Sequence, residues 1–581
     1  MVGGEAVRIA VIGVGPRGLS VLERVVSHAR ASGPPIELLL IEPGELGVGI
    51  HSASQPDFLL LNTIASQLTI FSDEQMTPGK PVTPGPSLFD WCRSRNLDVR
   101  FDDFLPRRLL GEYLTWAAGV LLAEAPDRLT VRRLRTYATD VRQAGSQALV
   151  TLADGSEEIA DLAVVTTGHG LATAGRMQLN GLASIPYPLP HVADIQAGQT
   201  VAVLGSGLTA MDVVAMLTVG RGGRFEHGRY LPSGSEPRIV LTNRSGQLPC
   251  ARPATRADRR PAPARYFTPE AVHALRAQSP DGRLDFRSQV EPLIVREVHT
   301  RMAGASAAER AMVAEVLQPA NRRWRSYQDF CDHQVDRAQA DLVQAERGLG
   351  DSLVKEGLEC LRDHRQALCA ALDPPGLTAE SHEYFMKVYV PLVNRAVIGP
   401  QKERIREVLM LLQAGIVTLG PGPRPALTPE SSGWQLRSTG LDEPAEQAVD
   451  VVINANLTWP VTDPGLDPIG SSLRRWVAPG PGGTRALGLD RYGYAIPQQQ
   501  NGGRRTVAVF GPPAEGASYY NHYVPSPGVW SRILTDLDQV LEPTLADSGR
   551  AAGSSLRLMS EPTADTGLLI EPATVSSGRS P

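Results

Sequence analysis

Lysine is nearly absent from this chain. Of its 57 basic residues only four are lysines and the rest are arginines; the lysines are Lys80, Lys355, Lys387 and Lys402. We interpret this bias as the codon usage of a high-GC genome, with anion recognition by guanidinium groups as the alternative. Composition alone therefore assigns no arginine to a binding site, and a functional role for any one arginine needs evidence from its own position. The net charge is only −5, so nothing calls for a nucleic-acid partner.

Cysteine is also scarce and scattered. The five cysteines form no CxxC pair, which argues against a redox-active disulfide, and neither they nor the eleven histidines show metal-ligand spacing. No apolar run reaches about 18 residues, so we expect no transmembrane helix and no membrane partner. The first apolar strand begins by residue 8, which leaves no room for a signal peptide. These absences favour a cytoplasmic globular protein without a metal.

The N-terminal segment carries a dinucleotide-binding pattern. Residues 8–18 read RIAVIGVGPRG, an apolar run that leads into three glycines, Gly13, Gly15 and Gly18. A helix-like stretch follows, and a second apolar run at 36–41 ends at Glu42. This is the strand, turn, helix, strand and acid order of a Rossmann unit, in which the acid accepts hydrogen bonds from a ribose. The glycines allow a tight turn, close approach of a pyrophosphate and close packing of helix on strand.

A second pattern of the same kind lies at 201–212, VAVLGSGLTAMD. Gly205 and Gly207 are its first two glycines, and Ala210 takes the third position, where a small residue suffices. Arg244 follows the next predicted strand, where a ribose-binding acid would otherwise stand. An arginine at this point favours a 2′-phosphate and therefore NADPH. We interpret Asp212, inside this pattern, as a structural acid rather than a ligand.

Two nucleotide sites in one chain indicate electron transfer between them, with FAD in one site and the reductant in the other. The run DLAVVTTGHG at 161–170 is typical of the strand that ends the FAD domain of such flavoproteins. The run TVAVFGPP at 506–513 resembles the late strand whose glycine, Gly511, passes close to the isoalloxazine. We therefore predict an α/β fold with two Rossmann-like domains, in which an NADPH domain interrupts a split FAD domain.

Composition shifts divide the chain further. We expect the first part of the FAD domain at 1–195, the NAD(P)H-binding domain at 196–267, and a helical insertion or cap at 268–403. The second part of the FAD domain then covers 404–545 and includes the strand DVVINANL at 450–457. The segment 546–581 is rich in Ser, Gly, Ala and Pro and is predicted to be a disordered tail.

Several of these segments resemble one known group. The chain is similar to FAD/NAD(P)-binding proteins related to microbial N-hydroxylating monooxygenases, which include flavin N-oxygenases that convert aspartate to nitrosuccinate. The resemblance covers roughly 5–250 and 385–535. It rests on GVGPRG at 13–18, LLLNTIASQLTIF at 59–71, LPRRLLGEYLTWAA at 105–118, TTGHG at 166–170, GSGLTAMD at 205–212 and GPPAEGASYYNHYVPSPG at 511–528. The chain departs from N-hydroxylases in reading INANL at 453–457, and it lacks the Baeyer–Villiger fingerprint.

The resemblance implies a reaction. NADPH would reduce FAD, O₂ would form a C4a-hydroperoxyflavin, and that species would oxygenate the nitrogen of a small, aspartate-like amino acid or amine. The segment 57–71 would line the flavin, with Asn62 as a polar contact or else a turn-stabilising residue. Asn521 lies in an aromatic segment, 519–523, that is expected against the flavin. His51 could lie near the pyrophosphate, although a loop histidine packed on its own backbone is the preferred interpretation.

An acidic substrate needs cationic partners. Lys387 and Arg395 lie in an otherwise apolar segment, where charged residues are informative, and Arg322, Arg323 and Arg325 form a cluster on the expected cap. Either group is a candidate clamp for carboxylates, and a solvated surface role is the alternative for each residue.

Three functions remain open at this stage. The first is the monooxygenase, with O₂ and a small molecule as partners. The second is an NAD(P)H-dependent flavoprotein reductase or dehydrogenase that passes electrons to a small acceptor or a partner. The third is a non-catalytic scaffold, which the intact glycines of both patterns disfavour. The sequence admits a homo-oligomer and leaves the oligomeric state, the substrate and the number of oxygenation rounds open.

Overall fold

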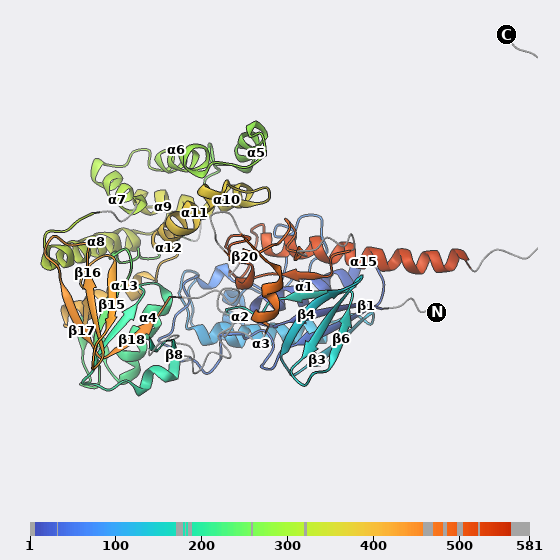
Figure 1. Ribbon diagram of the computed structural model, residues 1–581, viewed down its shortest axis with the longest axis horizontal. Coiled ribbons are helices and arrows are strands. Elements are labelled where there is room, and N and C mark those ends of the chain that lie inside the picture. The colour runs from blue at the N-terminus through green and yellow to red at the C-terminus, as the bar shows by residue number, and fades with distance from the viewer. Residues whose placement is uncertain are drawn as a thin grey trace, which may run out of the picture.

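Two mainly parallel sheets and a layer of helices are the largest parts of the computed structural model (Figure 1). It describes residues 6–31, 33–169, 178–179, 182–183, 189–256, 259–318, 322–456, 469–479, 485–496, 504–520 and 523–558. Within these residues no helix is both long enough and apolar enough to cross a bilayer.

The first sheet has five parallel strands in the order β21-β7-β1-β2-β3. Its strands are β1 (Val7–Ile12), β2 (Ile36–Ile41), β3 (Leu129–Leu134), β7 (Leu162–Val165) and β21 (Val507–Val509). The central strand β1 pairs with β2 over its whole length, from Val7 opposite Ile36 to Ile12 opposite Ile41. Because β21 comes from near the C-terminus, the predicted split of the FAD domain is present in this sheet.

Both faces of the first sheet are covered, as its nearly continuous apolar strands require. Ile9 and Val11 pack into the helical face, whereas Ala10 and Ile12 pack on the opposite face. The helices are α1 (Pro16–Ala31), α2 (Leu88–Ser94), α3 (Arg107–Ala123) and α15 (Arg532–Leu558). The opposite face is covered by a meander of β4 (Ala138–Ala144), β5 (Gln147–Leu152) and β6 (Glu157–Ala160), and by α14 (Gly470–Leu473).

The second sheet has the strand order β14-β13-β10-β18-β9-β8. Its strands are β8 (Gln178–Leu179), β9 (Leu182–Ala183), β10 (Thr200–Leu204), β13 (Arg238–Thr242), β14 (Val417–Leu419) and β18 (Val451–Asn454). One face packs against α4 (Leu208–Leu217), α8 (Tyr327–Arg347) and α13 (Lys402–Gln413). The other packs against a sheet of β15 (Pro425–Pro429), β16 (Trp434–Ser438) and β17 (Glu446–Val449).

The strand VVIN at 451–454 corrects the predicted domain division. It is β18, and it pairs in parallel with β10 of the second sheet, from Val451 opposite Val201 to Asn454 opposite Leu204. Residues 404–454 therefore contribute α13, β14 and β18 to the second nucleotide-binding unit instead of the FAD domain. We propose that the second part of the FAD domain begins after β18.

The remaining helices form a separate layer with its own apolar core along one side of the molecule (Figure 1). They are α5 (Pro269–Gln278), α6 (Glu291–Arg301), α7 (Ala307–Leu317), α9 (Leu353–Asp363), α10 (Arg365–Leu372), α11 (Ala379–Tyr384) and α12 (Val390–Val397). Two π-helical turns, Phe286–Val290 and Phe385–Tyr389, precede α6 and α12. Two small hairpins, β11 (Arg224–Glu226) with β12 (Arg229–Leu231) and β19 (Val477–Pro479) with β20 (Arg485–Leu487), complete the strands.

Helix α15 continues to Leu558, so the predicted tail does not begin at 546. Residues 559–581 lie outside the described residues. Strands β5 and β6 form a hairpin, and Gly155 in its turn has a φ of +84°.

Candidate active site between the two nucleotide-binding sheets

The carboxyl ends of the central strands of the first sheet carry the residues expected to hold FAD. Gly13 follows β1, Glu42 follows β2, Thr166 follows β7 and Gly511 follows β21 within two residues. Since parallel strands end at one edge of their sheet, these residues lie together, at the position where open α/β sheets bind ligands.

The three glycines of the first pattern have different structural reasons. Gly13 has a φ of +84°, and a Cβ there would lie 2.7 Å from Cα of Thr167. A Cβ on Gly18 would lie 2.3 Å from the carbonyl oxygen of Gly13. At Gly15 the nearest atom to a Cβ is Cα of Gly49, at 3.4 Å, which is ordinary contact. Gly13 and Gly18 are therefore required by the fold itself, and Gly15 is free to serve the ligand.

Glu42 is held directly against the glycine loop. Its carboxylate accepts hydrogen bonds from the backbone N–H of Val14 at 2.8 Å and of Gly44 at 3.0 Å. The side chain is half-buried at the end of β2. An acid fixed beside the first turn, with the N-terminus of α1 next to it, fits the ribose and pyrophosphate of FAD.

The second pattern forms a matching site on the second sheet. Gly205 has a φ of +129°, and Gly207 is the residue that precedes α4. No atom lies within 4 Å of a Cβ built on Gly207, so open space faces the free N–H groups of this helix. Arg244 is exposed just after β13, and its Nη2 lies 3.4 Å from the carbonyl oxygen of Lys387. These residues fit a dinucleotide, and the place of Arg244 suits a 2′-phosphate.

A cavity of about 160 Å³ lies between the two units. Asn62 and His51 line it from the FAD side, and Leu208 and Asp212 line it from α4. Burial, helped by the charge of Arg107, lowers the pKa of His51 to about 3, so the imidazole is neutral at physiological pH. Its Nδ1 is buried without a hydrogen-bond partner in the described residues, which leaves it available to a bound group.

An ion pair joins the two units beside this cavity. Nη1 of Arg107, the first residue of α3, lies 2.7 Å from Oδ2 of Asp212 on α4, and both side chains are at most 10% exposed. Nη2 of Arg107 also donates to the carbonyl oxygen of Leu60 at 3.3 Å. Asp212 is therefore a structural acid, as expected, but one that connects two domains.

The predicted carboxylate clamp is not assembled at this cavity. Lys387 is exposed and forms an ion pair with Glu383, one turn away on the helix surface. The guanidinium of Arg395 donates to the carbonyl oxygens of Val316, at 2.9 Å, and Gln318, at 3.5 Å, at the end of α7. It caps that helix, because the last carbonyl groups of a helix lack partners within the helix.

The arginine cluster at 322–325 also has another role. Arg322 stacks on Trp324, with its guanidinium carbon 4.1 Å from the ring centroid, and Arg323 pairs with Asp442 at 2.9 Å. The carbonyl oxygen of Arg325 accepts a hydrogen bond from the N–H of Glu443. All three arginines are exposed. Arg323 and Arg325 attach this segment to the turn at 441–443 of the second unit, and none of the three arginines lines the cavity. Asn521 lies outside the described residues.

Three other arginines gather where the aromatic segment was expected to meet the flavin. Arg17, in the first turn of α1, lies near Tyr523, and Arg365, at the start of α10, lies near both Tyr520 and Tyr523. Arg362, at the end of α9, donates to Gln67. Sequence reasoning missed all three, although Arg17 stands inside the first glycine pattern.

The comparison with known proteins agrees with this geometry. The FAD-NAD(P)-binding family model matches residues 10–170. The chain is 30% identical to a nitrosuccinic acid synthase of Aspergillus oryzae, over 94% of each chain. The chain belongs to the family of flavin-dependent N-monooxygenases.

Two bacterial members of this N-monooxygenase family are equally similar. They are L-aspartate N-monooxygenases that form nitrosuccinate, from Streptomyces davaonensis and Streptomyces cremeus; each is 30% identical over 92% of this chain, and over 97% and 94% of its own length. The predicted fold class, the FAD and NADPH cofactors and the monooxygenase activity are thereby confirmed, and the reductase alternative is disfavoured.

Proposed function

We propose that this enzyme oxygenates the amine nitrogen of aspartate, with NADPH and O₂ as co-substrates. The observation that carries the proposal is the 30% identity over 94% of the chain to a nitrosuccinic acid synthase, with both nucleotide patterns intact. In the first round an amine, O₂, NADPH and a proton give a hydroxylamine, water and NADP⁺. One oxygen atom enters the new N–O bond, and the other leaves as water with the two electrons of NADPH.

FAD, when bound, accepts the hydride and activates O₂. The chain must hold it and keep water away from the reacting atoms. Glu42 and the N-terminus of α1 would hold its ribose and pyrophosphate. Asn62 and the neutral imidazole of His51 offer polar contacts in a small cavity between the two nucleotide sites.

The proposal is tested with purified enzyme and a panel of amino acids and amines. We expect aspartate to accelerate consumption of both NADPH and O₂, and mass spectrometry to find an N-oxygenated product. If NADPH is consumed at the same rate with every amine and no amine is oxygenated, the enzyme is a reductase or oxidase instead.

NADPH is expected to be a better substrate than NADH. Arg244 is exposed at the end of β13, where its guanidinium can pair with the 2′-phosphate. A hydrogen bond to a charged group contributes about 1.5–3 kcal/mol, or roughly 10- to 150-fold in affinity. Arg244→Ala should remove most of the preference in kcat/KM while leaving the NADH value unchanged. Arg424→Ala, a neighbouring arginine, is the control. Equal use of the two nucleotides by the unmodified enzyme would contradict the assignment.

A further inference from the structure

Guanidinium groups of the helical layer project toward the FAD unit at one place. Arg362 lies in the last turn of α9, which ends at Asp363, and Arg365 begins α10 after a break at His364. Nη2 of Arg362 lies 3.3 Å from Oε1 of Gln67, within the segment expected to line the flavin. The guanidinium carbon of Arg365 lies 5.1 Å and 4.9 Å from the ring centroids of Tyr520 and Tyr523.

This junction adjoins the FAD position. Arg17 stands inside the first glycine pattern, and its Cγ lies 3.6 Å from a Cβ built on Gly511. Its guanidinium carbon is 6.0 Å from the centroid of Tyr523, the ring that Arg365 also contacts. One aromatic ring therefore separates Arg365 from the edge of the first sheet where FAD is held.

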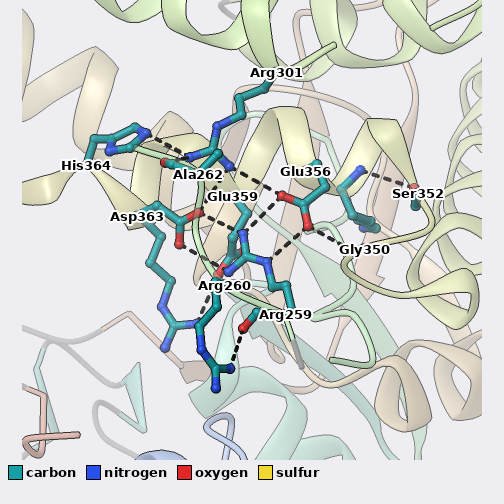
Figure 2. A network of polar contacts seen from close by, with 12 residues as sticks. Arg259, Arg260, Ala262, Arg301, Gly350, Ser352, Glu356, Glu359, Asp363 and His364 are labelled. Atoms are coloured by element: carbon teal, nitrogen blue, oxygen red, sulfur yellow. Dashed lines mark hydrogen bonds and ion pairs between the residues drawn. The ribbon is translucent and has the colours of Figure 1, made fainter. Parts of the chain in front are cut away.

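An ion-pair network lies behind the junction, and Figure 2 shows Arg259 and Arg301 in it with Glu356 and Asp363. The ion pair between Arg362 and Glu359 fixes Arg362 in place. Glu359 accepts from Arg362 at 3.0 Å and from Arg252 at 2.7 Å, and its pKa falls to about 2 because these cations outweigh the effect of its burial. The network joins four guanidinium groups to three carboxylates: Arg252, Arg259, Arg301 and Arg362, with Glu356, Glu359 and Asp363. One positive charge therefore remains in excess among these groups.

Arg365 adds a second positive charge. Among the described residues no ion pair to its guanidinium is present; its contacts there are with the faces of two tyrosines. Tyr520 has a φ of +62°, a backbone conformation that a bulky residue rarely adopts and that surrounding packing has to maintain. Its ring stacks on that of Tyr523, with centroids 5.5 Å apart, and the neighbouring Tyr519 is buried in the helical core. The tyrosine pair is thus fixed beside both arginines.

We propose that Arg362 and Arg365 bind the two carboxylates of a dicarboxylic amine substrate beside the flavin. The planar guanidinium matches a carboxylate with two parallel hydrogen bonds, and two excess positive charges match a dianion. The network behind Arg362 holds its guanidinium in place before the substrate arrives. This site rests on the proposed function and replaces the clamp expected at Arg395 and the 322–325 cluster.

Binding of succinate to the FAD-loaded enzyme tests the site. Succinate has both carboxylates but no amine, so it binds without being oxygenated, and titration calorimetry gives its Kd. Arg365→Ala should raise this Kd roughly 10- to 150-fold, the range for loss of a hydrogen bond to a charged group, and Arg362→Gln should do the same. Arg365 has no ion pair to lose in the described residues, so its variant should keep the thermal midpoint of the unmodified enzyme.

Arg322→Ala is the matched control, since it removes an arginine that also stacks on an aromatic ring but lies on the second unit. Its Kd for succinate should not change. Unchanged succinate binding in both Arg365→Ala and Arg362→Gln, or no succinate binding by the unmodified enzyme, would overturn the site. Product analysis with aspartate separates the two proposals: weaker succinate binding in the variants, with no amine oxygenated by the unmodified enzyme, supports the site and rejects the proposed function.

Discussion

A Gly15→Val variant is expected to purify in folded form without bound FAD. The Cβ position at Gly15 has ordinary contact with Gly49, and the φ of this residue is not in the left-handed region, so valine enters without a severe clash. Gly15 precedes α1, and its carbonyl oxygen accepts the hydrogen bond from the N–H of Leu19. Loss of a glycine at such a position costs only about 1 kcal/mol of folding free energy. The two methyl groups, however, would occupy space that the pyrophosphate needs at the helix N-terminus.

Flavin content and folding are measured separately in this experiment. Visible absorbance after gel filtration reports bound FAD, and far-ultraviolet circular dichroism reports the fold. Gly119→Ala is the control, because Gly119 lies within α3 with no atom within 4 Å of its Cβ position. That variant should keep its full flavin content and gain roughly 0.5–1 kcal/mol from helix propensity. A Gly15→Val protein with the flavin spectrum of the unmodified enzyme would show that FAD binds elsewhere.

The two nucleotide-binding units were predictable because their signals are local. A strand, a glycine turn and a helix follow one another within some thirty residues, and the turn geometry demands glycine wherever the chain is. Gly13 and Gly205 both have positive φ, as a tight turn between strand and helix requires. The positions of Glu42 and Arg244 were predictable for the same reason, because each residue follows the next strand of its unit.

Such local signals could not predict which of the two sheets contains the strand VVIN at 451–454. A short parallel strand with three apolar residues in a row suits the centre of either sheet, so its sequence carries no information about its neighbours. Only the tertiary structure pairs it with β10, across a separation of some 250 residues. The late strand at 507–509 was correctly assigned to the first sheet. The signal was Gly511, which follows the strand at the point where the chain is expected to pass close to the isoalloxazine.

The arginines that we propose to bind the substrate, Arg362 and Arg365, could not be distinguished in the sequence from the many other arginines. In a chain with almost no lysine, arginine performs most cationic roles: it caps α7 as Arg395, pairs on the surface as Arg323 and neutralises buried acids as Arg252. A charged residue in an apolar segment was taken as a sign of function at Arg395, but capping a buried helix end creates the same pattern. The distinguishing property of Arg365, a guanidinium against two rings from a distant segment, exists only in three dimensions.

The second large effect concerns the ion pair between the two nucleotide-binding units. Asp212→Asn keeps the shape of the side chain but removes the negative charge that pairs with Arg107, and both side chains are at most 10% exposed. Breaking a buried ion pair on one side costs about 3–5 kcal/mol. With an unfolding entropy of about 2.1 cal/mol/K per residue over a chain of 581 residues, we expect the midpoint of thermal unfolding to fall by roughly 2–4 °C. Because α4 also carries the second glycine pattern, displacement of this helix should slow hydride transfer from NADPH, by up to about 100-fold.

The adjacent residue on α3 supplies the control for this variant. Arg108 pairs with Glu112 on the same helix, at 2.8 Å, but these side chains are 34% and 39% exposed. Glu112→Gln makes the same chemical change as Asp212→Asn and should cost under about 1 kcal/mol, because water screens an exposed pair. A double variant, Arg107→Met with Asp212→Leu, should recover most of the lost stability, since replacing both charges leaves none of them buried. If Asp212→Asn unfolds at the same temperature as Glu112→Gln, the pair does not hold the two units together.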